Sequence, residues 1–203
     1  MVSLRAEQQA ETRDRLLDAA TALFAETGFS GTSVAAIAKR AGVTTGAIYS
    51  NFTGKDELFA AVVERHMKRQ AETYRTLYSE GGTPAERMQR GADRWMALIA
   101  EEPDYFPLFV EVWRVGMAKP KIRQRLRKAY ANLIDELASL VREGSPEPLD
   151  EATATQFALI VCSLADGLAM HKILDPVLVP DDLFGLFLRF TIESGQEAAA
   201  QGP

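Results

Sequence analysis

The sequence predicts an all-α protein of about nine helices, arranged as a three-helix head at the N-terminus followed by a larger helical bundle. Three observations support this fold class. Apolar residues recur at helical spacing along almost the whole chain, glycine and proline fall between the periodic stretches, and no segment alternates polar and apolar residues as a half-buried strand does. With 203 residues, of which 47% are hydrophobic and 25% charged, the chain can bury a sizeable core.

Four helices are expected in the first part of the chain. Residues 16–24 place apolar side chains at i, i+4, i+7 and i+8, and Gly28 then ends this helix, because glycine readily adopts the left-handed backbone of a helix end. The Gly81–Pro84 cluster interrupts the pattern further along. The other expected helices before that break cover residues 34–41, 44–51 and 53–78.

Five more helices are expected after the break. Proline marks helix ends in this part, because it cannot donate a helical hydrogen bond, and Pro120 and Pro176 lie between periodic stretches. The chain from residue 197 onward is expected to be a frayed tail. The five apolar helix faces lie over residues 88–99, 106–117, 126–140, 157–168 and 183–190.

The charge distribution gives the first indication of function. A net charge of −5 argues against a nucleic-acid-binding protein. Between Glu26 and Asp56, however, the chain has no acidic residue, while Lys39, Arg40 and Lys55 fall within that window. Because salt screens charge effects beyond roughly 10 Å, such a window can lie against phosphate even on an anionic protein.

Composition also predicts where the protein acts. The longest strongly apolar stretch, residues 157–165, is far shorter than the roughly 20 residues of a membrane span. Residues 1–10 lack the apolar core of a secretory signal. The single cysteine, Cys162, cannot form an internal disulfide and is expected to be an inert buried thiol. We therefore expect a cytoplasmic protein without membrane contact.

Residues 32–51 form the most informative segment. Two helices of about eight residues are too short to be stable alone, and pairing them across a glycine-containing turn gives a helix-turn-helix. Gly42 suits the left-handed backbone of the turn, and Thr44 suits the N-cap of the second helix. The apolar side chains expected to hold both helices against the first one are Val34, Ile37, Val43 and Ile48.

The outward surface of the second short helix is expected to be small and polar. Hydroxyl, amide and phenol groups can bond to phosphates or base edges in a major groove, and Gly46 lets the backbone approach closely. Lys55 adds its charge to the positive end of the next helix. The residues expected to contact DNA are Ser33, Thr44, Thr45, Gly46, Tyr49, Ser50, Asn51 and Lys55.

One combination of motifs in this segment is specific. It consists of TSVAAIA at residues 32–38, AGVTTGAIY at 41–49, NF at 51–52 and KDEL at 55–58. This combination resembles the DNA-binding domain of the TetR family of transcriptional regulators, over about residues 12–60. The resemblance implies a recognition helix at about residues 44–50, with Tyr49 and Lys55 on phosphates. Asn51 stands where histidine is frequent in the family.

The C-terminal part resembles the ligand-binding half of the same family at DGLAM, residues 166–170, and LDP, residues 174–176. The resemblance implies that the last two helices pair with those of a second subunit. A stripe of small and apolar residues favours such close packing, and a two-fold dimer reads a palindromic double-stranded DNA operator. The residues expected at the dimer interface are Phe157, Ile160, Val161, Leu164, Leu168, Leu183, Phe187 and Phe190.

The resemblance further implies a cavity for a small-molecule effector, so we assign residues 1–55 to a helix-turn-helix DNA-binding domain and residues 56–203 to an effector-binding and dimerisation domain. The residues that would line this cavity recur at helical spacing, which by itself is equally typical of core residues. An aromatic lining favours a partly apolar effector, whose identity stays open. The residues expected to line the cavity are Trp95, Met96, Phe106, Phe109, Trp113, Met117 and Tyr130.

Two other classes of function stay open. A helical ligand-binding protein without DNA binding is the nearer alternative. An all-helical enzyme is the more distant one, because the chain has no glycine-rich phosphate loop, zinc signature or nucleophile elbow. His66 is expected on the surface, and no metal or cofactor is expected, since neither histidine has a second histidine or cysteine at ligand spacing.

Overall fold

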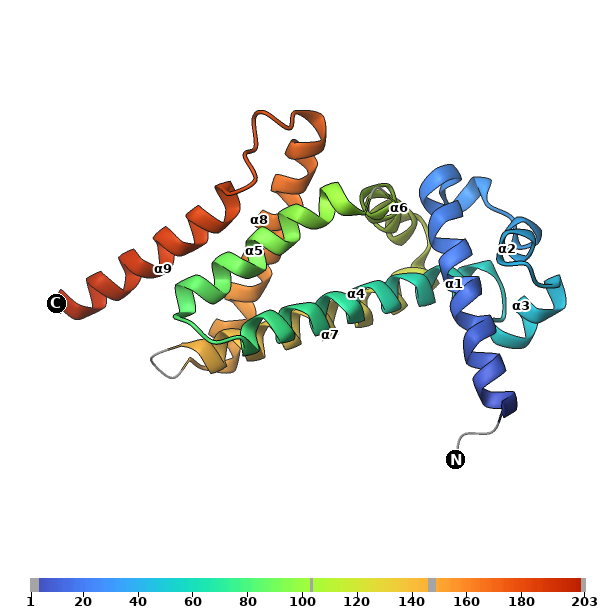
Figure 1. The fold of residues 1–203 in the computed structure, drawn as a ribbon, viewed down its shortest axis with the longest axis horizontal. Coiled ribbons are helices and arrows are strands. Elements are labelled where there is room, and N and C mark those ends of the chain that lie inside the picture. The colour runs from blue at the N-terminus through green and yellow to red at the C-terminus, as the bar shows by residue number, and fades with distance from the viewer. Residues whose placement is uncertain (1–3, 103, 146–148, 202–203) are drawn as a thin grey trace. The chain divides into compact units, whose positions relative to one another are not determined.

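The computed structural model describes residues 4–102, 104–145 and 149–201, and within these ranges it holds nine helices and no strand (Figure 1). The predicted all-α fold class is confirmed. The helices are α1 (Leu4–Gly31), α2 (Val34–Ala41), α3 (Thr45–Asn51), α4 (Lys55–Ser79), α5 (Pro84–Glu101), α6 (Tyr105–Ala118), α7 (Pro120–Gly144), α8 (Glu151–Leu174) and α9 (Leu183–Gln201).

The end of α9 differs from the prediction. The helix continues to Gln201, so the frayed tail expected from residue 197 is wrong for residues 197–201. These residues are a glutamate, three alanines and a glutamine, all strong helix formers that extend a helix already begun. Residues 202–203 lie outside the described part of the chain.

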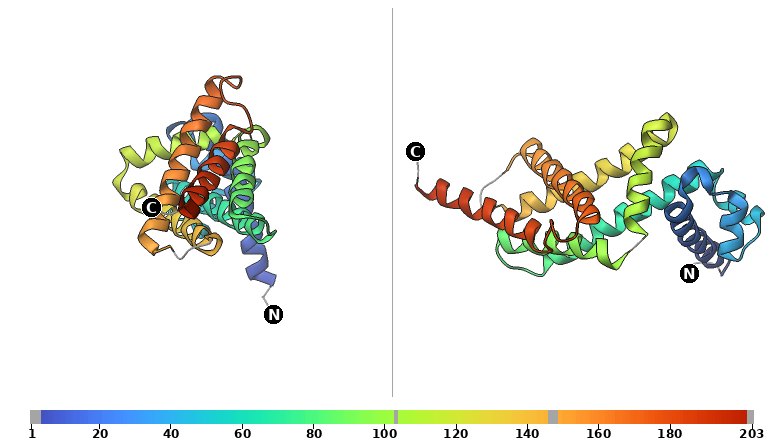
Figure 2. Two further views of the ribbon diagram at one scale, coloured as in Figure 1. Left: turned by 90° about the vertical axis from the view of Figure 1, so that its left-hand side faces the viewer. Right: turned by 90° about the horizontal axis from the view of Figure 1, so that it is seen from above.

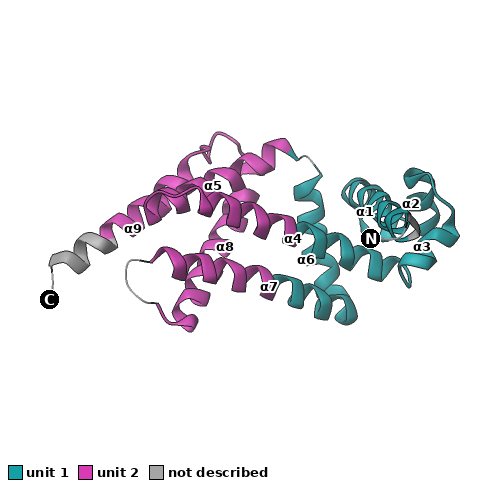
Figure 3. Ribbon diagram, turned by 60° about the horizontal axis from the view of Figure 1, so that its bottom comes forward, with its two compact units in different colours: residues 1–67, 102–130 teal, residues 68–101, 131–203 magenta. Residues whose placement is uncertain are grey.

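The chain divides into two compact units (Figure 3). The first comprises residues 1–67 and 102–130, and the second comprises residues 68–101 and 131–203. Helices α4 and α7 each contribute their N-terminal part to the first unit and their C-terminal part to the second. The domain boundary predicted at residue 55 concerns function and stays a prediction.

In the first unit, α1 packs against α2, α3 and α6 (Figure 2). The rings of Phe24, Phe29 and Phe59 meet with centroids between 5.1 and 5.9 Å apart. Ile37 of α2 and Ile48 of α3 are fully buried in the same cluster. Burial of one such side chain contributes roughly 1.5–3 kcal/mol, so tertiary contacts hold two helices that are too short to be stable alone.

The predicted stop at Gly28 is present as a break inside α1. Its φ of 68° and ψ of 170° are far from helical values, and this combination is essentially restricted to glycine. Helical geometry resumes for one short turn, which reaches Gly31. The chain therefore changes direction at Gly28 before it enters the helix-turn-helix.

His66, on α4 in the first unit, is half-buried, so the prediction that it lies on the surface is wrong. Its ring packs against Tyr105, with centroids 4.4 Å apart, and Tyr105 in turn stacks with Phe109. The physical reason is its position on α4: His66 follows Val62 and Val63 by three or four residues, so it shares their buried face.

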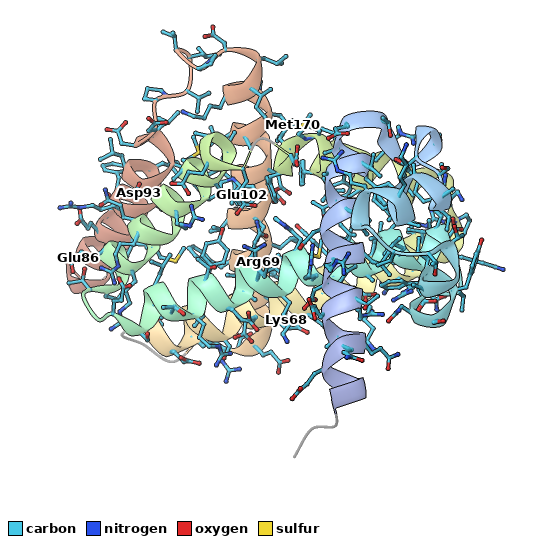
Figure 4. All side chains as sticks on the ribbon, turned by 45° about the vertical axis from the view of Figure 1, so that its right-hand side comes forward. Lys68, Arg69, Glu86, Asp93, Glu102 and Met170 are labelled. Atoms are coloured by element: carbon cyan, nitrogen blue, oxygen red, sulfur yellow. The ribbon has the colours of Figure 1, made fainter. Side chains whose placement is uncertain are left out.

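In the second unit, α5 packs against α9 and α8. A Cβ at Gly185 of α9 would lie 2.5 Å from Oδ1 of Asp93, so α9 approaches α5 more closely than a side chain would allow. A reciprocal cap begins α5: the Thr83 N–H donates to Glu86 Oε2 at 2.8 Å, and the Glu86 N–H donates to Thr83 Oγ1 at 3.2 Å. Figure 4 labels Glu86 and Asp93.

Helix α8 is strongly apolar. An 18-residue window within it has a mean hydropathy of 1.6, so by length and composition alone it is long and apolar enough to cross a membrane. The sequence prediction considered only residues 157–165 and missed this longer stretch. Only 17% of the window is buried within the chain, which leaves an apolar helix surface without a covering element in the part of the chain described.

Candidate nucleic-acid interface

Helix α2 has a hydrogen-bonded cap at each end. Ser33 accepts a bond from the backbone N–H of Ala36 at 3.1 Å. Gly42 adopts φ 64° and ψ 36°, the left-handed backbone predicted for the turn, and its N–H donates to the carbonyl of Lys39 at 3.2 Å. These bonds satisfy polar groups that the ends of a helix otherwise leave without partners.

Helix α3 begins at the predicted N-cap. Thr44 Oγ1 accepts a bond from the backbone N–H of Ala47 at 3.3 Å. Ile37 and Ile48 are buried between the helices, and Val34 and Val43 pack against the same cluster, as the sequence predicts. The turn and the apolar contacts together fix the angle between α2 and α3.

Two arginines of α1 hold the C-terminal ends of these short helices, which the sequence analysis did not anticipate. Arg15 Nη2 donates to the carbonyl of Ala41 at 2.6 Å. Arg13 Nη1 donates to the carbonyl of Asn51 at 3.1 Å, and its guanidinium lies 4.2 Å from the centroid of the Phe52 ring. A cation at a helix C-terminus interacts favourably with the last carbonyls. The partners are 26 and 38 positions apart, so no local pattern could have indicated them.

The outward surface of α3 is polar. Thr44, Thr45, Gly46, Tyr49 and Ser50 are exposed, and Tyr49 exposes 60% of its surface. Ser50 donates its hydroxyl hydrogen to the carbonyl of Gly46 at 3.0 Å. Thr44 uses only an acceptor lone pair in its cap, so its hydroxyl hydrogen stays available to an outside acceptor such as a phosphate oxygen.

Ser33 and Asn51 flank this surface. Ser33 is exposed, and, like that of Thr44, its hydroxyl oxygen accepts the cap hydrogen bond through one lone pair. Asn51 is half-buried, and its Nδ2 donates to the carbonyl of Ala47 at 2.8 Å. One amide hydrogen and the amide oxygen of Asn51 are left for other contacts.

Gly46 is not required by packing. A Cβ placed there would meet only Thr44 Oγ1, at 3.7 Å, which is an ordinary contact. A side chain would therefore fit the folded protein. The absence of a side chain affects only what can approach α3 from outside.

Lys55 begins α4 and turns inward. Its ammonium group donates to the carbonyls of Phe29 and Thr32, each at 2.8 Å, and lies 4.4 Å from the centroid of the Phe29 ring. Burial, and after it the charge of Lys119, lowers the pKa of Lys55. Two of the three ammonium hydrogens are used inside the protein, so Lys55 has a structural role that the sequence did not indicate. A phosphate contact through the third hydrogen stays a prediction.

The segment between Glu26 and Asp56, which has no acidic residue, offers fewer free positive charges in the structure than its sequence indicates. Arg40 pairs with Glu26, which lies just at the edge of the window, at 2.7 Å. Lys55 is committed to the carbonyls described above. Lys39 is exposed and forms no ion pair with the described residues, so it is the cation of this window best able to meet a phosphate.

The residues predicted to line an effector cavity fall in both units. In the first unit, the rings of Phe106, Phe109, Trp113 and Tyr130 form a series in which neighbouring centroids lie between 5.6 and 6.4 Å apart. Trp113 exposes 50% of its surface and Met117 exposes 72%. The first unit thus brings four of the predicted aromatic side chains together on α6 and α7.

In the second unit, Trp95 and Met96 are core residues of α5. The indole N–H of Trp95 donates to the carbonyl of Ala165 at 3.1 Å, which ties α5 to α8. Their burial agrees with a core role, and contact with an effector stays a prediction.

The sequence analysis did not predict that three polar side chains interact within the second unit. Tyr74 of α4 lies near Cys162 and Asp166 of α8 and interacts with both electrostatically. Burial raises the pKa of the Asp166 carboxyl from 3.8 to about 7, and burial together with Asp166 raises the pKa of the Cys162 thiol to about 12. Cys162 is therefore a protonated thiol at neutral pH, in agreement with an inert cysteine. Asp166 is only partly ionised there.

Helices α8 and α9 carry an exposed apolar surface in the second unit. Ile160 exposes 66% of its surface and Phe190 exposes 70%, and among the other predicted interface residues Leu183 and Phe187 are exposed while Phe157, Val161, Leu164 and Leu168 are half-buried. Further exposed apolar residues were not predicted, among them Met170, which Figure 4 labels on α8. We define the C-terminal apolar surface as Leu159, Ile160, Met170, Ile173, Leu174, Val177, Leu178, Leu183, Leu186, Phe187 and Phe190.

Comparison with known proteins assigns the family. Residues 16–62 match the family described as "Bacterial regulatory proteins, tetR family", and residues 84–196, more than half of the chain, match the "BetI-type transcriptional repressor, C-terminal" family. The chain belongs to the TetR family. Its predicted function, a ligand-responsive transcriptional repressor, is confirmed, and the members of the family are transcriptional regulators rather than enzymes.

The relatives of this TetR-family chain span most of its length. The regulator BetI from Burkholderia thailandensis is 30% identical over 77% of this chain and 78% of its own. FadR from Bacillus subtilis, whose structure is in complex with stearoyl-CoA, is 20% identical with a TM-score of 0.70, over 87% of this chain and 95% of its own. A regulator from Saccharomonospora viridis, in complex with choline, is 22% identical with a TM-score of 0.70, over 91% and 96%. These two structures share the fold.

Proposed function

We propose that this protein represses transcription as a homodimer, which places α3 of each copy in the major groove of a palindromic operator, and that a small, partly apolar effector weakens this binding. The observation that carries the proposal is the exposed polar surface of α3. Caps, arginine contacts and buried isoleucines fix this surface in place, and no acidic residue lies on it. A rigid, uncharged, hydroxyl-rich helix end suits the base edges and phosphates of a groove.

Each exposed residue would have a distinct task on DNA. Thr45, in the first turn of α3, would meet a base edge, because a recognition helix reads bases with its N-terminal residues. Gly46 would let the helix backbone come close to DNA, since Gly46 is exposed and carries no side chain. Tyr49 and Lys39 would bond to phosphates, which positions the helix without reading sequence.

A second copy of the chain would cover the C-terminal apolar surface. The exposed large apolar side chains of α8 and α9 would form a patch of the kind that is uncommon on soluble monomers and marks interfaces. A two-fold dimer formed through α8 and α9 would present two copies of α3, which must lie about 34–36 Å apart to enter successive grooves. The dimeric arrangement therefore explains both the uncovered helices and the need for a palindromic operator.

The effector would bind at the aromatic side chains of α6 and α7 in the first unit. An aromatic lining of this kind favours an organic molecule with an apolar portion. The FadR and Saccharomonospora structures hold stearoyl-CoA and choline, which supports an organic effector without identifying it. A coupling free energy of about 1–3 kcal/mol between effector and operator is typical of such switches.

The site of action would be the cytoplasm. The relatives are bacterial transcriptional regulators, and the DNA that they bind lies in that compartment. The apolar length of α8 is then used for dimerisation and not for crossing a membrane.

The test is a selection of genomic fragments on the purified protein, with the bound sequences read out. A Tyr49→Ala variant is run beside the wild type. Lys121→Ala serves as the control, because Lys121 is an exposed residue of α7. We expect an inverted repeat that the wild type and the control recover and that Tyr49→Ala loses. If the wild type enriches nothing at moderate or low salt, the DNA-binding proposal fails and a helical ligand-binding protein takes its place.

A further inference from the structure

The end of α1, the start of α4 and the middle of α6 meet at Phe29 in the first unit. The break at Gly28 removes the backbone N–H of Phe29 from the helical pattern, and this N–H donates to Oε1 of Glu111 on α6. The ammonium groups of Lys55 and Lys119 lie 4.4 and 4.5 Å from the centroid of the Phe29 ring. One residue of the head is therefore held by its N–H, its carbonyl and its ring.

Glu111 is the buried member of this junction. It exposes only 7% of its surface, and a carboxylate at that depth is costly unless it is paired and hydrogen-bonded. Arg114 donates to it twice, from Nε at 2.6 Å and from Nη2 at 2.5 Å. The bonds from Arg114, and then the bond from the Phe29 N–H, hold the pKa of Glu111 below its usual value. Glu111 is therefore ionised at neutral pH, and its bond to the head is charge-assisted.

The backbone of α1 is shaped to receive this carboxylate. A Cβ at Gly28 would lie 3.2 Å from Oε1 of Glu111, tighter than nearly all real contacts of that kind. Glycine at this position thus supplies both the unusual backbone angles and the room for the carboxylate. Arg114 adds a contact to the hydroxyl of Ser30 at 3.4 Å, on the other side of Phe29 in the chain.

Helix α6 has two different surfaces on opposite sides. Glu111 is on the side that packs against α1, together with Leu108 and Val115, which lie in the buried cluster. Phe109 and Trp113 are two residues away in either direction, so their side chains project from the other side of the helix. There they form the aromatic series with Tyr130. A shift or rotation of α6 caused on its aromatic side must also move the carboxylate on its head side.

We propose that Glu111 is a positioning residue, whose bond to the Phe29 N–H fixes the helix-turn-helix to α6 and so transmits the position of α6 to the recognition helix. The proposal rests on the proposed operator binding. It adds that the angle of the head is set by one buried carboxylate and not only by apolar packing. Loss of that carboxylate frees the head to adopt a range of angles while its own core persists.

The test compares Glu111→Ala with Glu111→Gln, which keeps an oxygen that can accept the Phe29 N–H. Asp104→Ala is the matched control, because Asp104 begins the same helix, is exposed and makes no side-chain cap bond. Affinity is measured for the recovered inverted repeat and for versions with its half-sites one base pair closer or farther apart. Hydrogen exchange at the Phe29 amide is followed in the same proteins.

We expect Glu111→Ala to lower affinity for the native spacing about tenfold, the size of effect that a lost charge-assisted hydrogen bond produces. Its preference for the native over the altered spacings should shrink, because a freed head adapts to either. Exchange at the Phe29 amide should rise about tenfold or more. Glu111→Gln should recover most of the affinity, the spacing preference and the slow exchange, and Asp104→Ala should match the wild type.

Two results would overturn the proposal. One is a folded Glu111→Ala protein with wild-type spacing preference. The other is an equal loss at all spacings with an unchanged Phe29 amide, which is the behaviour of a residue with a merely structural role. If the wild type binds no inverted repeat, the proposed function fails instead. Hydrogen exchange at the Phe29 amide then tests separately whether Glu111 holds the helix-turn-helix to α6. Equal exchange rates in Glu111→Ala and Asp104→Ala would refute that role.

Discussion

The helix-turn-helix and helices α8 and α9 differ in how their apolar side chains are buried. The apolar side chains of the three N-terminal helices are buried together with those of α4, α6 and α7 in one cluster. The helix ends are capped by Ser33, Gly42, Thr44 and two arginines. Helices α8 and α9 leave a large apolar surface uncovered. The head is thus complete within one chain, whereas the C-terminal helices need another molecule. Folding and assembly should therefore respond to different substitutions.

The largest expected effect is on assembly. Ile160→Asp places a carboxylate on the C-terminal apolar surface, where Ile160 exposes 66% of its surface, and desolvating an unpaired charge costs several kcal/mol. We expect the dimer dissociation constant to rise at least a hundredfold while each chain stays helical. Sedimentation measures the first property and circular dichroism the second, with Lys121→Asp as the control. If the Ile160→Asp protein remained a dimer at micromolar concentration, the proposal that α8 is part of the dimer interface would be contradicted.

The next effect separates Lys55 from Lys39, the two lysines of the segment without acidic residues. Lys55→Ala removes two bonds to buried carbonyls, so we expect it to lower the free energy of unfolding by about 1.5–3 kcal/mol, the range for hydrogen bonds to charged groups. Lys39→Ala should leave stability unchanged and reduce the salt dependence of DNA binding by about one phosphate contact. Denaturant unfolding and salt titration distinguish them, and the reverse pattern would show that the inward contact of Lys55 is of little energetic importance.

A smaller effect separates two glycines of the head. Gly42→Ala forces alanine into a left-handed backbone with its Cβ 2.9 Å from Arg15 Nη2, and we expect a loss of stability of about 1–2 kcal/mol. Gly46→Ala fits the fold and should leave the melting temperature unchanged or slightly higher. It should nevertheless weaken operator binding, because the methyl group lies on the outward surface. Undiminished binding by a well-folded Gly46→Ala protein would contradict the close approach proposed for that residue.

The smallest effect concerns pH. The folded pKa of Asp166 is raised to about 7, so between pH 4 and pH 7 the folded protein binds the proton more tightly than the unfolded chain does. This residue therefore makes stability fall as the pH rises through that window. Asp166→Asn should flatten this slope and raise stability most at pH 8. Melting temperatures between pH 5 and pH 8 test this, and parallel curves for both proteins would mean that Asp166 is better solvated than its burial indicates.

Much of the head could be predicted because its signals are local. The glycine in the turn, the hydroxyl caps and the apolar spacing each follow from neighbours within a few positions, and all are present where expected. The outward residues Thr44, Thr45, Gly46 and Tyr49 follow once the buried ones are known, because a helix has two sides. Their contacts with DNA are still predictions, as are those of the cavity and the dimer interface.

Other features required contacts between distant positions. The expected surface position of His66 is wrong, because the ring of Tyr105 covers it. The inward turn of Lys55 depends on the carbonyls of Phe29, at the end of α1, and of Thr32, directly after it, 26 and 23 positions earlier. The end of α9 was missed for a different reason, since a tail of strong helix formers was judged by its terminal position and not by its propensity.

The order of the amino acids was enough to predict the all-α fold, the helix-turn-helix and its polar outward surface, because these depend on periodicity and on glycine and hydroxyl residues acting within one turn. Which charges are free and which are used internally depends on contacts between distant positions. Arg13, Arg15, Lys55 and Glu111 look like ordinary surface residues in the sequence, yet each bonds to a backbone group more than 20 positions away. The physical reason is that a backbone carbonyl accepts from, and a backbone N–H donates to, any suitable side chain that the fold brings near, and no local sequence pattern indicates such a contact.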